Sequence, residues 1–309
     1  MPGRRIVIFM TDFQQKITAM LPGLELRLNE PMVKHTSFRI GGPAEVMAFP
    51  KTVEELQEIL KQSALLDTKP AILGSGTNIL APDAGIQGLV ICMKECLDTI
   101  EQVDATHIRV SAGVTMTRAA VFAANLGLSG LEFAHGIPGS VGGGVYMNAG
   151  AYGGEISQVC TQVEVMDFSG NLRTLSCDEM AFSYRHSRLE EEEAIVISAT
   201  FVLMPKPTEE IRTVMQELMT KRKNSQPLDL PSAGSAFKRP VGGYAAALID
   251  NAGLKGYCVG GAAVSEKHAG FVVNLGGAKA EDVKQLLSDV ADIVYVDTGI
   301  HLEPEVRIW

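Results

Sequence analysis

Three polar residues far apart in the chain have side chains suited to a reaction on an anionic substrate. Arg185 is a fixed cation, Ser235 a hydroxyl and Glu305 a carboxylate. A guanidinium can bind a carboxylate through two parallel hydrogen bonds, whereas a serine donates a proton only when its neighbours activate it. A carboxylate beside a negatively charged substrate must be protonated or held by a cation. Taken singly, Arg185 could also belong to a surface ion pair, Ser235 to a turn, and Glu305 to the solvated edge of a strand.

Two glycine-rich segments could bring backbone N–H groups close to a phosphate. The first, GSGTN at 74–78, follows a short apolar run but lacks the third glycine and the helix of a Rossmann loop. The second, GIPGSVGGG at 136–144, ends in three consecutive glycines, each of which destabilises a helix by about 1 kcal/mol relative to alanine. Something must therefore pack very close to this backbone. Either a flavin or pyrophosphate, or tight helix–sheet packing, would explain it.

The composition narrows the class of protein. The chain has 309 residues, 46% of them hydrophobic, so two or three globular domains are expected. A net charge of −9 argues against nucleic-acid binding. Five cysteines without a Cys-x-x-Cys pair indicate reduced thiols rather than a disulfide framework or a zinc site, and no metal is expected. Since no apolar run approaches the roughly 20 residues that span a bilayer, we expect a cytoplasmic protein without membrane insertion. We also expect a monomer.

Hydrophobic periodicity and turn signals divide the chain into an N-terminal extension and three folded regions. The extension is 1–20, the first region 21–93, the second 94–207, which the tail 298–309 rejoins, and the third 208–297. Strands are predicted at 44–49, 71–73, 88–93, 107–111, 163–168, 194–203 and 271–274, with 302–309 as an edge strand containing a proline. Helices are predicted from the capping box at Thr52, at 117–125 before Gly127, from Ile211, at 244–251 and at 281–291.

At this point the motifs resemble those of UDP-N-acetylenolpyruvoylglucosamine reductases. The resemblance is carried by GSGTNIL at 74–80 and by the long, highly specific run IPGSVGGGVYMNAGAYG at 137–153. SYR at 183–185, GSAFK at 234–238 and EPEVR at 303–307 continue it in the family's order. The similarity covers about residues 30–309, nearly the whole chain.

This resemblance implies an α+β fold, a cofactor and a reaction. The fold would be a two-part FAD-binding domain of the vanillyl-alcohol-oxidase (PCMH) type followed by a C-terminal α+β substrate-binding domain. The FAD would be noncovalent, in keeping with the absence of histidine from 74–78. NADPH would reduce it, and the flavin would then reduce UDP-N-acetylglucosamine enolpyruvate to UDP-N-acetylmuramate in peptidoglycan synthesis.

The resemblance also assigns roles to individual residues. Arg185 would stabilise charge on the substrate carboxylate, Ser235 would donate the proton, and Glu305 would be the third catalytic residue. The FAD would contact Gly74, Ser75, Gly76, Thr77, Asn78, Ile79, Leu80, Ile137, Pro138, Gly139, Ser140, Gly142, Gly143, Asn148, Ala149, Gly150 and Ala151. The residues predicted to bind the substrate are Tyr184, Lys238, Arg239, Lys255, Lys267 and His268, and the three lysines and Arg239 are the candidates for binding its diphosphate.

Two departures from the family's first subtype are informative. That subtype has an insertion after the Tyr-Arg pair that closes over the substrate, whereas here 186–193 runs directly into a predicted strand. The chain therefore resembles the shorter second subtype. Arg239 replaces an asparagine, and a cation there suits a diphosphate.

Two alternative functions remain open from the sequence. The protein could be a different oxidoreductase on the same FAD fold, or it could be a sensor that binds a UDP-sugar.

Overall fold

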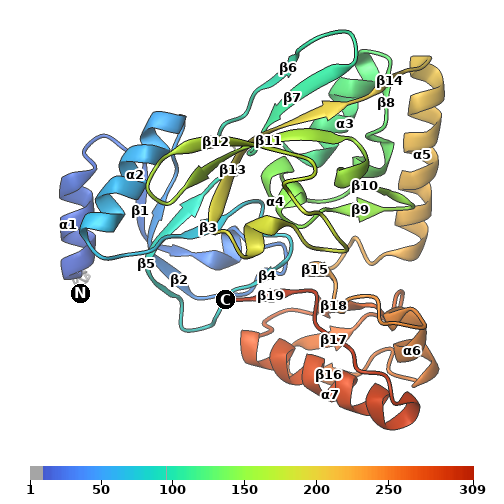
Figure 1. Ribbon diagram of the computed structural model, residues 1–309. Coiled ribbons are helices and arrows are strands. Elements are labelled where there is room, and N and C mark those ends of the chain that lie inside the picture. The colour runs from blue at the N-terminus through green and yellow to red at the C-terminus, as the bar shows by residue number, and fades with distance from the viewer. Residues whose placement is uncertain (1–9, 95) are drawn as a thin grey trace, which may run out of the picture.

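The computed structural model describes residues 10–94 and 96–309, which form three parts (Figure 1). Two lobes lie side by side, and a smaller C-terminal domain lies beneath the second. Residues 1–9 of the predicted N-terminal extension lie outside the described residues.

The first lobe is a four-stranded sheet with two helices packed on it. The strand order is β1-β2-β5-β3, with β1 antiparallel to β2 and the other pairs parallel. Helix α2 begins after Thr52, as predicted, because the Thr52 hydroxyl accepts the Glu55 N–H at 3.2 Å. The reciprocal bond of the predicted capping box is not formed, since the Glu55 carboxylate accepts the N–H of Lys51 instead. The elements are α1 (Asp12–Met20), β1 (Leu26–Pro31), a 3-10 helix (Met32–Lys34), β2 (Pro43–Ala48), α2 (Val53–Leu65), β3 (Ala71–Leu73), β4 (Ile79–Leu80) and β5 (Ile86–Cys92).

Much of the predicted extension belongs to this lobe. Helix α1 begins with a capping box between Thr11 and Gln14, and Ile17 is fully buried in the core with Leu56 and Ile59 of α2. The sequence signal is weak because the helix has nine residues and only one fully buried apolar side chain.

The second lobe is built on a five-stranded antiparallel sheet in the order β12-β11-β13-β7-β6. Met166, Ile195 and Ile197 of this sheet pack into the core of the first lobe, so the two lobes share a hydrophobic interface. The strands are β6 (Ile100–Gln102), β7 (His107–Ser111), β8 (Leu128–Ser129), β9 (Gly150–Ala151), β10 (Gly154–Glu155), β11 (Cys160–Asp167), β12 (Leu172–Ser176), β13 (Ala194–Val202) and β14 (Met204–Pro205). The helices are α3 (Met116–Asn125), α4 (Val141–Tyr146) and 3-10 turns at Glu132–Ala134, Ile156–Gln158 and Arg188–Glu190.

Helix α5 (Thr208–Ser225), which the sequence places at the start of the third region, packs on the second lobe. Its Ile211 and Met215 lie in that lobe's core, and Figure 1 shows the helix along the lobe's outer edge. The preceding segment, which looks like a linker in the sequence, forms β14 and pairs with β8. This pairing holds the start of α5 against the second lobe.

The C-terminal domain is a four-stranded antiparallel sheet, β15-β18-β17-β16, packed against two helices. Helix α7 is longer than predicted and ends at Gly299, whose φ of 71° suits glycine. The β-branched residues near its end disfavour helix locally, but burial of Val290 and Val294 in the core overrides that preference. The elements are β15 (Ser232–Ser235), α6 (Ala245–Asn251), β16 (Cys258–Val259), β17 (Ala262–Val264), β18 (Phe271–Asn274) and α7 (Ala280–Thr298).

The backbone of the C-terminal tail pairs with the first lobe, and the side chains of Glu305 and Arg307 also form ion pairs with the second lobe. Strand β19 (Arg307–Ile308) pairs in parallel with β4 (Ile79–Leu80), directly after the first glycine-rich loop. Upstream, the backbone N–H groups of Lys238 and Glu305 donate to Glu303 and Ala236 at 2.8 and 2.9 Å. A two-residue parallel pairing between distant segments leaves no pattern in the sequence.

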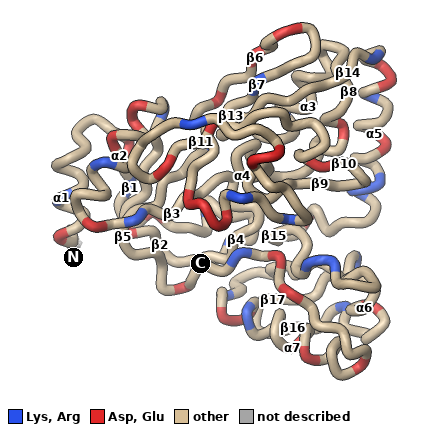
Figure 2. Tube along the Cα trace, in the orientation of Figure 1, with Lys and Arg blue, Asp and Glu red and all other residues tan. Residues whose placement is uncertain are grey.

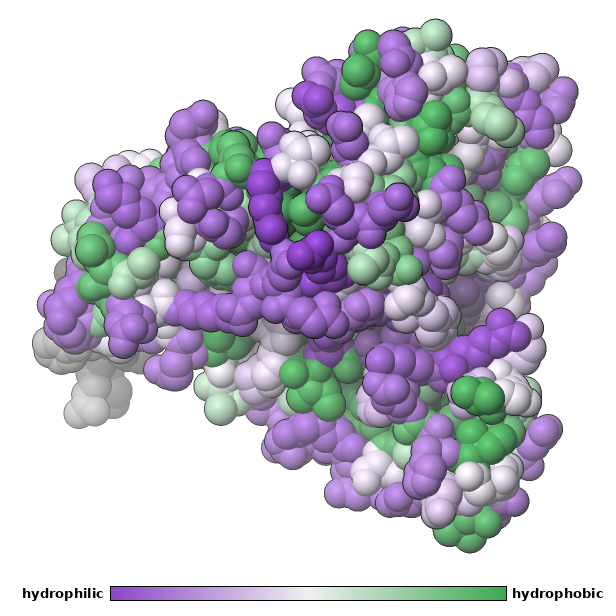
Figure 3. All heavy atoms as spheres, in the orientation of Figure 1, coloured by the Kyte–Doolittle hydropathy of each residue, from purple (hydrophilic) through white to green (hydrophobic). Residues whose placement is uncertain are grey.

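Charges of both signs are interspersed along the described chain (Figure 2). On the face shown in Figure 3, hydrophobic residues are scattered among hydrophilic ones. Among the described residues, no helix has the length and apolar character required to cross a bilayer.

Candidate active site

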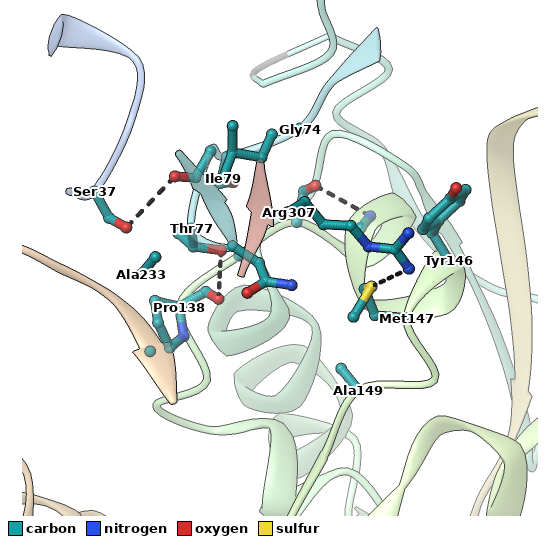
Figure 4. A pocket seen from close by; sticks show the side chains of 18 of the residues that line it. Ser37, Gly74, Thr77, Ile79, Pro138, Tyr146, Met147, Ala149, Ala233 and Arg307 are labelled. Atoms are coloured by element: carbon teal, nitrogen blue, oxygen red, sulfur yellow. Dashed lines mark hydrogen bonds between the residues drawn. The ribbon is translucent and has the colours of Figure 1, made fainter. Parts of the chain in front are cut away.

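A cavity of about 1510 Å³ lies where the two lobes and the C-terminal domain meet. Figure 4 shows Gly74, Thr77 and Ile79 from the first lobe near Pro138 of the second lobe and Ala233 of the C-terminal domain. Pockets for a single small molecule are typically on the order of 300–1,000 Å³. The cavity is therefore large enough for a dinucleotide and a second ligand.

The two glycine-rich loops touch each other in the cavity wall. The Thr77 hydroxyl donates to the Pro138 carbonyl at 3.1 Å (Figure 4). Gly76 has a φ of +62°, and an added Cβ would collide with the His35 carbonyl oxygen. Only glycine allows both this backbone conformation and this close approach. One side of the first loop therefore packs against the backbone at His35, and the other side of the loop faces the cavity.

The wall formed by these loops fits a bound nucleotide. Ser75 lines the cavity, and its buried hydroxyl has no hydrogen-bond partner within the described part of the chain. Buried polar groups are normally paired, so this hydroxyl is available to a ligand. Gly143 also faces open space, because an added Cβ would meet only the Ser140 hydroxyl within 4 Å. These features fit FAD, which would lie along Gly74–Asn78 and the segment at 137–143.

Two of the residues predicted to contact FAD do not line the cavity. Leu80 is buried in the core of the C-terminal domain. Asn148 is also buried, and its side chain donates to the Ser183 carbonyl at 3.0 Å and accepts the Ser157 N–H at 2.9 Å. The hydrogen bond from Asn148 to Ser183 therefore stabilises the turn that carries Arg185. A motif in the sequence does not reveal which of its side chains face inward.

The triple glycine has mainly a packing role. An added Cβ at Gly142 would lie 2.9 Å from the Ala112 Cβ, and one at Gly144 would lie 2.8 Å from the Met116 sulfur. Close packing of α4 on Ala112, which directly follows β7, and on Met116 of α3 therefore explains two of these glycines. Gly143, which has space beside it, is the position that points to a ligand.

Arg185 and Glu305 meet in the cavity although they are far apart in sequence. The Arg185 Nε donates to the Glu305 carboxylate at 2.7 Å, and an Nη donates to the Gly150 carbonyl at 3.1 Å. Their side chains are only 21% and 11% exposed. Burial raises the pKa of Glu305 above its usual value, although the adjacent guanidinium opposes this shift. Glu305 is thus held by the cation, and its protonation is more favourable than in water.

Ser235 lies at the end of β15 and lines the same cavity. The next residue, Ala236, accepts the backbone N–H of Glu305 at 2.9 Å. This backbone pairing places Ser235 beside the segment of Glu305, whose carboxylate pairs with Arg185, so all three predicted catalytic residues line the cavity.

The residues predicted to bind the substrate do not line the described cavity. Tyr184 is half-exposed, and its hydroxyl accepts the Arg239 N–H at 3.2 Å. The Arg239 guanidinium lies 3.9 Å from the centroid of the exposed Tyr244 ring. These three residues form an open patch on the protein surface.

The other four substrate candidates have partners within the protein. Lys238 forms an ion pair with Glu303, and Lys255 with Asp250 at 2.7 Å. Lys267 donates to the Lys223 carbonyl near the end of α5 at 2.6 Å, where a cation complements the helix dipole. His268 accepts the Gly270 N–H at 3.1 Å, and burial lowers its pKa.

Three arginines in the cavity wall were not assigned a role from the sequence: Arg39, Arg222 and Arg307. Arg307 forms an ion pair with Glu190 and lies over the Tyr146 ring, near Met147 (Figure 4). Arg222 could have been recognised, because it follows Ile211 and Met215 at helical spacing on the buried face of α5.

The comparisons with known proteins agree with this architecture. Residues 44–176 match the family model of an FAD-binding domain, and residues 226–309 match that of the UDP-N-acetylenolpyruvoylglucosamine reductase C-terminal domain. A crystal structure of UDP-N-acetylenolpyruvylglucosamine reductase from Thermus caldophilus superposes with a TM-score of 0.78 at 37% identity, covering 93% of this chain and 98% of that one. The predicted α+β fold class, with an FAD-binding domain followed by a C-terminal domain of this reductase family, is confirmed.

Fold and cofactor site together define an FAD-dependent oxidoreductase. Curated relatives from Agathobacter rectalis and Caldanaerobacter subterraneus, both called UDP-N-acetylenolpyruvoylglucosamine reductase, are 48% and 46% identical. The alignments cover 96% and 95% of this chain and 98% and 96% of the relatives. The chain belongs to the UDP-N-acetylenolpyruvoylglucosamine reductase family.

Proposed function

We propose that this enzyme uses NADPH to reduce its FAD and then reduces UDP-N-acetylglucosamine enolpyruvate to UDP-N-acetylmuramate. The reaction would serve peptidoglycan synthesis in the cytoplasm. The observation that carries the proposal is the Arg185–Glu305 pair, at 2.7 Å, in one cavity wall with Ser235. A cation, a carboxylate and a hydroxyl in that arrangement suit an enolpyruvyl group, which has a carboxylate beside a carbon–carbon double bond.

When bound, FAD supplies the hydride to one carbon of that double bond. The residues of the chain must then stabilise the negative charge that develops toward the substrate carboxylate and deliver a proton to the neighbouring carbon. Arg185 is suited to the first task because its guanidinium is fixed by Glu305 and Gly150 before substrate arrives. Preorganised donors of this kind contribute about 3–4 kcal/mol to transition-state stabilisation.

Ser235 is the proposed proton donor, since its hydroxyl lies at the end of β15 beside the segment that carries Glu305. Its proton passes to the carbon that carries the developing negative charge. Glu305 holds the guanidinium in place and, because burial raises its pKa, is suited to sharing a proton with groups in the cavity. The short connection after Arg185 contains one 3-10 turn, Arg188–Glu190, before β13 begins, which supports the shorter subtype.

The test is a two-step anaerobic experiment on the purified yellow protein. NADPH should bleach the flavin absorbance, and UDP-N-acetylglucosamine enolpyruvate should then restore it with formation of one UDP-N-acetylmuramate per flavin. Bleaching without reoxidation by this substrate would indicate a different oxidoreductase. A protein that NADPH does not bleach would instead fit a UDP-sugar sensor.

A further inference from the structure

A second arginine in the cavity is buried without a carboxylate partner. Arg222 is 7% exposed and lines the cavity from the last turns of α5. Its Nη1 donates to the Gln226 side chain at 3.1 Å, while its Nε is buried with no hydrogen-bond partner. Within residues 10–94 and 96–309, no carboxylate forms an ion pair with it.

This arrangement is unfavourable until an anion binds. Removing a guanidinium from water is costly, and buried charges in proteins are usually paired. Burial lowers the pKa of Arg222, which reflects the same desolvation. The Tyr152 ring lies 5.5 Å from the guanidinium carbon, and a cation–π contact of this kind compensates only part of the lost hydration.

The neighbours of Arg222 indicate which anion would reach it. It packs against Gly136, since a Cβ added there would lie 3.4 Å from the Arg222 Nε, and Gly136 is the first residue of the second glycine-rich segment. Beyond α5, Gln226 and Leu228 continue the cavity wall toward β15 and Ser235. Arg222 therefore lies between the cofactor loops and the wall that carries the proposed catalytic serine.

We propose that Arg222 binds a phosphate group of a nucleotide that occupies the cavity. A guanidinium presents a planar fork that matches two phosphate oxygens, and the aromatic ring of Tyr152 is positioned to lie beside the same nucleotide. FAD and a UDP-sugar both carry a diphosphate, so either ligand supplies this chemistry. Only the second of these sources rests on the proposed function.

The experiment compares Arg222→Met with the wild type and with Arg212→Gln, a substitution at an exposed arginine of the same helix. Apoprotein is titrated with FAD, FMN and riboflavin, and holoenzyme with UDP. Loss of a charge-assisted hydrogen bond weakens binding roughly 10–100-fold. If the phosphate is the cofactor's, Arg222→Met weakens FAD binding by that factor and leaves riboflavin unchanged. If it is the substrate's, UDP binding falls by that factor and FAD binding is unchanged.

Stability measurements separate this role from a structural one. Because an unpaired buried charge is removed, the Arg222→Met apoprotein should be at least as heat-stable as the wild-type apoprotein. Equal weakening of FAD, FMN and riboflavin, or unchanged binding of both FAD and UDP, would overturn the proposal. If Arg222→Met does not fold, Arg222→Gln is used for the same titrations, and failure of both to fold would make Arg222 a structural residue. None of these outcomes depends on whether the wild-type enzyme reduces the enolpyruvyl substrate, so the two proposals fail separately.

Discussion

Arg185 and Arg222 line the same cavity in opposite electrostatic situations. Arg185 is held by Glu305 at 2.7 Å and by the Gly150 carbonyl, whereas Arg222 has only the neutral Gln226 side chain at 3.1 Å. A paired guanidinium keeps one geometry before a ligand arrives, which suits stabilisation of a transition state. An unpaired one gains most when an anion binds, which suits ground-state binding of a phosphate. The difference separates a proposed catalytic wall from a proposed binding wall.

The largest effect is expected at Ser235, on the catalytic wall. Ser235→Ala should leave reduction of FAD by NADPH unchanged, because that step needs no proton on the enolpyruvyl carbon. Reoxidation by substrate should slow by about 10²–10⁴-fold, the usual contribution of a positioned acid. Stopped-flow traces of the two half-reactions measure this directly. Equal slowing of both would remove Ser235 from the proton-donor role.

The next largest effect is expected for Arg185→Lys. The rate of the second half-reaction should fall by roughly 10²–10³-fold, while the FAD content stays normal. Lysine keeps the charge but loses the planar fork that binds Glu305 and a substrate carboxylate together. Arg222→Lys, its counterpart on the binding wall, should change ligand affinity rather than the rate at saturating substrate. If both variants changed the rate at saturating substrate, or both changed only ligand affinity, the proposed difference in role between Arg185 and Arg222 would be wrong.

A double variant tests whether Arg185 and Glu305 act as a unit. Residues that work together lose their contribution when either is removed, so the effects do not multiply. The Arg185→Ala, Glu305→Ala enzyme should therefore be less impaired than the product of the two single variants. Strictly multiplicative losses, with normal flavin reduction in each case, would show two independent roles.

Glycine substitutions distinguish the ligand-facing position in α4 from a packing position. Gly143→Val should weaken FAD binding at least about 10-fold while the apoprotein remains folded, because the added side chain enters open space beside the cavity. Gly142→Val should instead destabilise the apoprotein by about 1–3 kcal/mol, since it meets Ala112. Thermal melts of the apoproteins with flavin titrations separate the two. Equal losses of stability would show that Gly143 also serves packing.

The smallest effect expected concerns pH and Glu305. Since burial raises its pKa in the folded state, the folded protein retains this proton at pH values where the unfolded chain has lost it. Wild-type stability relative to Glu305→Gln should therefore be highest below the unfolded pKa of about 4.5 and should fall as pH rises from there through the higher folded-state pKa. Apoprotein melts across this range measure it, with Glu303→Gln, an exposed carboxylate on the same tail, as the control. A wild-type curve parallel to that of Glu305→Gln would contradict the raised pKa.

Local patterns in the sequence predicted most of the α-helices in the described chain, some of its strands and the glycine-rich walls. Helix α2 starts at its threonine cap and α3 ends at Gly127, because caps and terminal glycines act within one turn. The sequence also located GSGTN and the triple glycine, yet it left open whether a ligand or the protein fills the space beside the latter. The structure answers this residue by residue, with Ala112 and Met116 against two glycines and open space beside Gly143.

What the sequence determined by itself is the identity and order of the chemical groups: the family motifs, the two loops, and an arginine, a serine and a glutamate in separate segments. Only the tertiary structure decided which of these groups meet. The tail reaches the cavity through pairing of Arg307–Ile308 with β4 and of Glu305 with Ala236, and α5 turns Arg222 inward through packing of Ile211 and Met215. Contacts of this kind arise when distant segments bury apolar surface and satisfy backbone hydrogen bonds together, so no short stretch of sequence contains them.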